Sequence, residues 1–108
     1  MTFQELQGRA LEIRKAYAGL EEKTYGKQWT SEQIAQGFVG DVGDLMKLVL
    51  AKSGVREIEQ VDEKLAHELA DCLWCVMVLA KEYHVDLETA FTETMNTLEK
   101  RIQTKLGT

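Results

Sequence analysis

Apolar residues recur at intervals of three and four along most of the chain, and no stretch alternates apolar with polar residues. This spacing places apolar side chains on one face of a helix, whereas a half-buried strand needs a repeat of two. The chain contains no proline, so glycines are its only strong helix breakers. The pattern predicts helices over about residues 3–23, 31–52, 63–83 and 87–105. We therefore expect an all-α fold, a four-helix bundle.

Capping residues mark several helix ends. Thr2 and Glu5 form the S/T-x-x-E pattern of a capping box at the start of the first helix. Asp62 and Asp86 are the expected N-caps of the third and fourth helices. Gly54 is expected to end the second helix in a left-handed conformation.

Length and charge bound the function. The 108 residues predict one domain, residues 1–108, and the net charge of −5 gives no reason to expect a nucleic-acid polymer as partner. No apolar stretch reaches the roughly 18 residues of a membrane span. The polar N-terminus lacks the apolar run of a signal peptide. We expect a cytoplasmic protein without a membrane partner.

Two acidic pairs are the main candidates for a functional site: Asp41 with Asp44, and Glu68 with Asp71. Residues three apart on a helix are neighbours, so each pair projects from one side of its helix. Four carboxylates converge if the two helices face each other, and the charges then require neutralisation by protons or by a cation. Hard divalent cations prefer oxygen ligands, so we predict a Mg²⁺ site held by all four residues.

Acidic pairs are also common on solvated helix faces, so either pair alone is a weak indication of a metal site. Neither pair has a basic residue four positions after its second member, where Leu48 and Cys75 stand instead. Apolar neighbours further indicate that the carboxylates lie at the edge of a core. Carboxylates that face separate regions of solvent would make both pairs incidental.

The glycines at positions 37, 40 and 43 repeat every three residues inside the second predicted helix, beside Asp41 and Asp44. Each costs up to ~1 kcal/mol of helix stability relative to alanine. We interpret the stripe as making room for the acidic pair. Trp29 lies in the preceding loop, where it could stack on a nucleobase or plug the end of the bundle, the second being slightly favoured.

Cys72 and Cys75 form a CxxC pattern, but it lies within a helix with no strand before it. Redox CxxC motifs lie at a helix N-terminus, so buried structural thiols are the better interpretation. His67 and Glu68 begin an HExxH-like pattern, yet Asp71 replaces the second histidine, which argues against a zinc protease. No phosphate-binding glycine loop or hydrolytic triad is present.

In this setting the acidic pairs resemble those of the MazG-type branch of the all-α nucleoside triphosphate pyrophosphohydrolases. That family carries ExxE on its second helix and ExxD on its third. The segments 64–73 and 79–91 resemble the third helix and the turn into the last one, and the resemblance covers about residues 30–102. The first motif departs from the family, because Asp41 and Asp44 stand where glutamates are expected.

The resemblance implies a MazG-like bundle that cleaves a nucleoside triphosphate to its monophosphate and pyrophosphate with Mg²⁺, a nucleotide-pool housekeeping activity. It implies a catalytic and metal-binding role for the four carboxylates and assembly as a homodimer or homotetramer. Relatives often carry basic residues on the last helix, which would bind the phosphates, and Lys100 and Arg101 match part of that run. Lys81 stands where relatives often have arginine. Thr97 replaces a frequent lysine. A catalytically weak nucleotide-binding protein and a regulatory helical partner remain alternatives.

Overall fold

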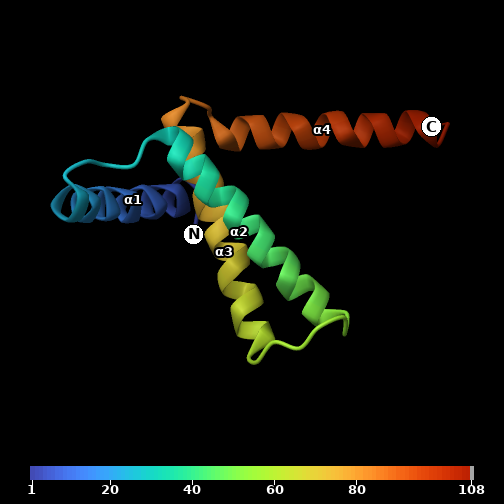
Figure 1. Ribbon diagram of the computed structural model, residues 1–108. Helices are drawn as coiled ribbons and strands as arrows, with labels where there is room; N and C mark the ends of the chain where they lie inside the picture. Colours follow the sequence, from blue (N-terminus) through green and yellow to red (C-terminus); the bar gives the residue numbers. More distant parts are fainter. Residues whose placement is uncertain (108) are drawn as a thin grey trace.

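The computed structural model describes residues 1–107, which form four helices: α1 (Phe3–Tyr25), α2 (Ser31–Lys52), α3 (Val61–Glu82) and α4 (Leu87–Lys105) (Figure 1). No strand occurs within residues 1–107, so the expected all-α class with four helices is confirmed. In this part of the chain, no helix combines the length and apolar character that crossing a membrane requires.

The capping predictions hold at two helices and fail at a third. The Thr2 hydroxyl accepts the Glu5 backbone N–H at 3.1 Å, and the Asp86 carboxylate accepts the N–H of Thr89 at the same distance. The prediction for Asp62 is wrong. The N-cap of α3 is Gln60, in a left-handed conformation with φ 55°, and Asp62 lies in the first turn, where it binds Lys52 Nζ at 2.6 Å.

Two short connections set the directions of the first three helices. Gly26 ends α1 with φ 79°, a conformation that favours glycine. Thr30 and Gln33 then form a capping box that starts α2. Gly54, with φ 84°, follows the C-cap of α2, as the sequence predicts. The connection that begins there returns the chain so that α3 runs antiparallel to α2.

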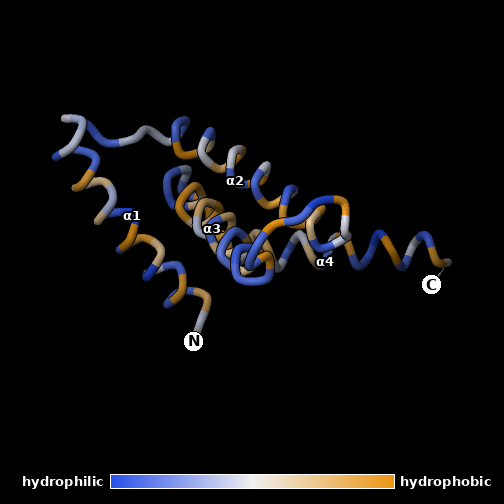
Figure 2. The backbone as a smooth tube through the Cα atoms, turned by 60° about the horizontal axis from the view of Figure 1, so that its bottom comes forward, coloured by the Kyte–Doolittle hydropathy of each residue, from blue (hydrophilic) through white to orange (hydrophobic). Residues whose placement is uncertain are grey.

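α3 is the central helix, with α2 packed along one side and α1 on the other (Figure 2). The core lies mainly between α2 and α3, and its buried side chains include Ile34, Leu48, Met77 and Val78. Side-chain hydrogen bonds join α1 to α3: the Trp74 indole donates to the carbonyl of Ala10 at 3.0 Å, and Gln7 donates to that of Met77 at 3.3 Å.

α4 projects away from the other helices (Figure 1). None of its residues is buried, although apolar side chains recur along it at helical spacing. Phe91 is 61% exposed and Ile102 is 58% exposed. One face of this helix therefore remains uncovered within a single chain.

Candidate functional site

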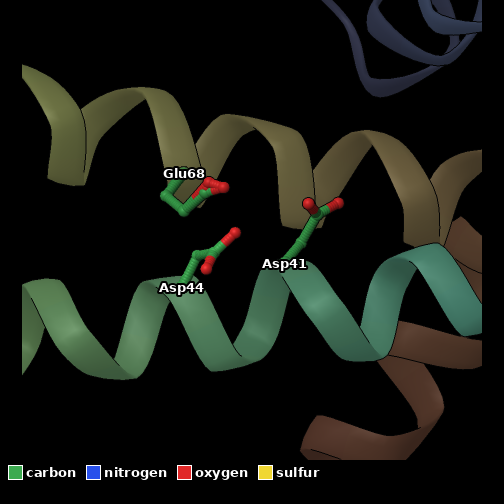
Figure 3. A group of neighbouring side chains, drawn as sticks. All are labelled: Asp41, Asp44 and Glu68. Carbon is green, nitrogen blue, oxygen red and sulfur yellow. The ribbon is translucent and has the colours of Figure 1, made fainter.

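Three of the four predicted carboxylates meet between α2 and α3. Asp41 and Asp44, one turn apart on α2, point toward α3, and Glu68 points back from α3 (Figure 3). One carboxylate oxygen from each of the three lies within 4.8 Å of the others. We call this group the carboxylate cluster. It forms because the antiparallel packing brings the middle of α2 against the middle of α3.

Glu68 is the electrostatic centre of the cluster. It is only 9% exposed, and burial, which disfavours its charged form, is the main cause that raises its pKa. The negative charges of Asp41, Asp71 and Asp44 raise it further, in that order. A buried carboxylate facing like charges is stabilised by a proton or by a cation.

Asp71 lies outside the carboxylate cluster. It pairs with His67, whose Nε2 is 3.1 Å from Asp71 Oδ2, across one turn of α3. It nevertheless acts on the cluster by raising the pKa of Glu68, and it lines the same pocket as Asp41. The structure thus brings three of the predicted ligands together and places Asp71 beside them.

Both acidic pairs have basic neighbours that the four-residue rule missed. Lys47 Nζ lies 3.9 Å from Asp44 Oδ1, three residues along α2, with both side chains mostly exposed. His67 precedes Asp71 by four residues rather than following it. Neither contact involves Glu68 or Asp41, so the buried part of the cluster keeps its excess negative charge.

The donor set of the cluster suits a hard divalent cation. All three side chains offer carboxylate oxygens, the ligands that Mg²⁺ prefers, from two facing helices. Their spacing within 4.8 Å allows one ion to contact more than one of them. The raised pKa of Glu68 means that its charged form is disfavoured here, which a nearby cation would offset. The residues present therefore fit the metal that the sequence predicts.

Cys75 contacts this site, which the sequence did not predict. Its thiol donates to Asp41 Oδ2 at a sulfur–oxygen distance of 3.5 Å. Burial, together with Asp41, raises the pKa of Cys75 to about 12, so the thiol keeps its proton. Both cysteines are free, as expected for structural thiols. Cys75 lies seven residues, or about two turns, after Glu68 on α3, and this spacing could have indicated the contact.

A pocket of about 710 Å³ is lined by residues of α1, α2 and α3 together with Trp29. Its lining includes the acidic residues Asp41 and Asp71 and the aromatic side chains of Tyr17, Trp29 and Trp74. We call it the aromatic pocket. Trp29 is 47% exposed and lines this pocket.

Two residues missed by the sequence analysis hold the Trp29 segment. Arg14 and Glu21, on α1, form a two-pronged ion pair with nitrogen–oxygen distances of 2.8 and 2.9 Å. Glu21 Oε1 also accepts the backbone N–H of Trp29 at 2.9 Å. The two charged residues are seven apart, which places them two turns apart on one helix face. This spacing could have indicated the ion pair.

The predicted phosphate-binding residues lie apart from the cluster within one chain. Lys81 is 13 residues after Glu68 on α3, about 20 Å along the helix axis. It lines a separate pocket of about 290 Å³. Lys100 and Arg101 are exposed residues of α4, the projecting helix. Neither residue belongs to the carboxylate cluster or lines the aromatic pocket.

Comparisons with known proteins place the acidic residues inside a family match. No curated protein and no solved structure matched the chain. A family model did match, over residues 30–105, which include α2, α3 and the whole carboxylate cluster. The match spans more than half of the chain and identifies its family by the helices that carry the acidic residues. The chain belongs to the family defined by the MazG nucleotide pyrophosphohydrolase domain.

Proposed function

We propose that the protein is a Mg²⁺-dependent nucleoside triphosphate pyrophosphohydrolase, which cleaves NTP or dNTP to the monophosphate and pyrophosphate. The carboxylate cluster is the observation that supports this most directly. Family membership gives nucleotide pyrophosphohydrolysis in general, and the cluster adds a set of oxygen donors suited to Mg²⁺. We further propose nucleotide-pool housekeeping in the cytoplasm as its role.

Asp41, Asp44, Glu68 and Asp71 form the proposed metal-binding and catalytic set. Bare carboxylates repel a triphosphate, and bound Mg²⁺ would supply the positive charge and the Lewis acidity that the reaction needs. Glu68 and Asp41 hold the buried side of the site, where the pKa of Glu68 favours neutralisation. The thiol of Cys75 restrains Asp41. Asp71, oriented by His67, borders the adjoining aromatic pocket.

The aromatic pocket is the proposed place for the nucleoside. Its lining includes Asp41 of the carboxylate cluster as well as aromatic side chains, so a nucleotide with its phosphates at the metal would have its base among those aromatic side chains. Trp29 offers a half-exposed indole for stacking on that base. This arrangement favours the stacking role of Trp29 over the plugging role.

A homodimer or homotetramer is the proposed assembly. On α4, Phe91 and Ile102 are largely exposed, and on α2 Val39 and Met46 are 70% and 52% exposed. A soluble monomer rarely leaves so much apolar surface uncovered. Lys100 and Arg101 would then serve the phosphates of a neighbouring subunit's substrate. Lys81 is the third proposed basic group, at the other end of α3.

Product analysis tests the proposed reaction. The purified chain, incubated with canonical and modified nucleoside triphosphates and Mg²⁺, should release pyrophosphate and the monophosphate, and EDTA should stop the release. Glu68→Gln should abolish it, whereas Glu93→Gln, an exposed glutamate on α4, should leave it unchanged. A nucleoside diphosphate with inorganic phosphate as first products would contradict attack between the α and β phosphates.

A nucleotide-binding protein with little catalysis is the second candidate. Asp41 and Asp44 are each one methylene shorter than glutamate, so an ion must lie closer to the α2 backbone than in a site built from glutamates. Mg²⁺-dependent nucleotide binding without pyrophosphate release would favour this candidate. Restoring release with Asp41→Glu and Asp44→Glu would identify the shorter side chains as the cause.

A further inference from the structure

The Arg14–Glu21 ion pair is unusually well enclosed for a pair on a single helix. The two side chains are 11% and 12% exposed, whereas the Arg9–Glu12 pair on the same helix is 67% and 70% exposed. Hydrogen bonding to Arg14 is the main cause that lowers the pKa of Glu21, so its carboxylate stays charged. Both residues precede the matched region 30–105, so family membership assigns them no role.

This pair is directed at one residue, Trp29. Glu21 accepts the Trp29 backbone N–H at 2.9 Å, and Arg14 Nη2 donates to the Trp29 carbonyl at 3.5 Å. Both polar groups of the Trp29 backbone are thus bound by the same pair. The pair also orders a segment without regular structure, since residues 28–30 lie between α1 and α2.

The Trp29 ring lies close to Gly37 of α2. Gly37 faces it: a Cβ built at that position would lie 3.6 Å from Trp29 Cζ3. The next residue, Thr30, is fixed by its capping box with Gln33. Gly37 is therefore the member of the glycine stripe that lies against an aromatic ring, whereas a Cβ at Gly40 or Gly43 would meet no heavy atom within 4 Å.

Arg14, Glu21 and Trp29 all line the aromatic pocket, which also contains Asp41 of the carboxylate cluster. We propose that the Arg14–Glu21 pair is a positioning pair, which holds the Trp29 indole where a nucleobase stacks. The identity of the ligand as a nucleotide rests on the proposed function. The pair itself touches no reacting atom in this scheme and acts through Trp29.

Pre-ordering the Trp29 segment strengthens binding, because an aromatic side chain on a free loop must be ordered when the ligand arrives. Base stacking on an aromatic side chain is worth ~1–3 kcal/mol, or about 5- to 150-fold in dissociation constant. Releasing Trp29 should cost much of that factor. A pair that only stabilised the fold would change the melting temperature without changing nucleotide affinity.

NMR titration of the indole N–H groups tests this without requiring hydrolysis. The chain has two tryptophans, so Trp29→Leu assigns the two indole signals. We would titrate AMP, GMP, CMP and UMP separately. At least one of them should shift the Trp29 signal. Glu21→Ala should weaken that binding about 5-fold or more, and Glu21→Gln, which can still accept the Trp29 N–H, should weaken it less. Glu12→Ala, from the exposed pair, should match the wild type.

The outcomes separate this inference from the proposed function. A Trp29 signal unaffected by all four monophosphates, or equal affinities for Glu21→Ala and Glu12→Ala, would overturn the inference even if pyrophosphate is released. A responsive Trp29 in a chain that releases no pyrophosphate would support it while removing the proposed reaction. In an active chain, Glu21→Ala should raise KM with little change in kcat, as expected for lost binding. If Glu21→Ala does not fold, Glu21→Gln compared with Glu12→Gln tests the inference with the Trp29 signal retained.

Discussion

Replacing Glu68 with glutamine should stabilise the metal-free protein while removing its Mg²⁺ response. Glu68 is 9% exposed, and its nearest oxygens lie within 4.8 Å of those of Asp41 and Asp44. At this separation two unit charges repel by roughly 1–3 kcal/mol, for effective dielectric constants from about 80 down to 20. The contribution of Asp44 belongs at the low end, because its side chain is 61% exposed and lies near Lys47.

We therefore expect Glu68→Gln to raise the free energy of unfolding by about 2 kcal/mol at pH 7 without metal. The glutamine keeps the shape of the side chain, and its amide can donate to Asp41 or Asp44. For a domain of this size, each kcal/mol corresponds to a rise of roughly 4–8 °C in Tm. The wild type should gain ~2.7 kcal/mol at a Mg²⁺ concentration 100 times its dissociation constant, and the variant much less.

The pH dependence gives an independent check on the same reasoning. The pKa of Glu68 is raised above its ordinary value of 4.5, so the folded state binds this proton more tightly than the unfolded state. Metal-free wild type should lose stability as the pH rises from about 4.5 through the raised pKa. Below that window Glu68 is protonated, and the advantage of Glu68→Gln should vanish.

Thermal melts of the wild type, Glu68→Gln and Glu93→Gln, with EDTA or with Mg²⁺, measure all of these effects. Glu93 serves as the control because it is an exposed glutamate on α4. A metal-free Glu68→Gln that melts at or below the wild type at pH 7 would refute the argument from repulsion. An equal Mg²⁺ response in both would show that Glu68 does not hold the ion.

Two further predictions concern α2 and α1. Gly43→Ala should stabilise the chain by up to ~1 kcal/mol, because alanine favours a helix and the added Cβ meets no heavy atom within 4 Å. Urea unfolding measures this change. A destabilised variant would show that a second copy occupies the space. The Glu21–Arg14 pair should contribute to the free energy of unfolding above pH 4.5, and this contribution should be lost as the pH falls through the lowered pKa of Glu21. Glu21→Gln should therefore reduce the pH dependence of acid unfolding, measured by circular dichroism. Glu12→Gln should leave that pH dependence unchanged.

The helices could be predicted because their apolar spacing is strong and each terminus depends on local residues. The Thr2 and Asp86 caps follow from side chains that bind the next turn, which needs no knowledge of the fold. The prediction that Asp62 caps α3 was wrong because Lys52, 10 residues away, binds its carboxylate. The projection of α4 could not be predicted either, since its apolar pattern equals that of a packed helix.

The carboxylate cluster was predictable in outline and less so in detail. Spacing alone places Asp41 with Asp44, and the family pattern suggests that Glu68 faces them. Asp71 pairs with His67 instead of joining the carboxylate cluster. Which of these two partners it contacts depends on the direction of its side chain, which spacing in the sequence does not determine. The Cys75–Asp41 contact and the Arg14–Glu21–Trp29 arrangement join residues from different segments, and composition gives no indication of such contacts.

If the proposed assembly covers α4, the order of this helix depends on the concentration of the protein. Helices in proteins gain most of their stability from packing of an apolar face, and α4, with 19 residues, has no buried residue to support it. Its stability must therefore come from whatever covers Phe91 and Ile102. If that is a second copy, dilution shifts the balance by mass action and unwinds α4 before α2 and α3 separate. The far-ultraviolet signal of a dilute sample would then lose one helix while the carboxylate cluster remains assembled.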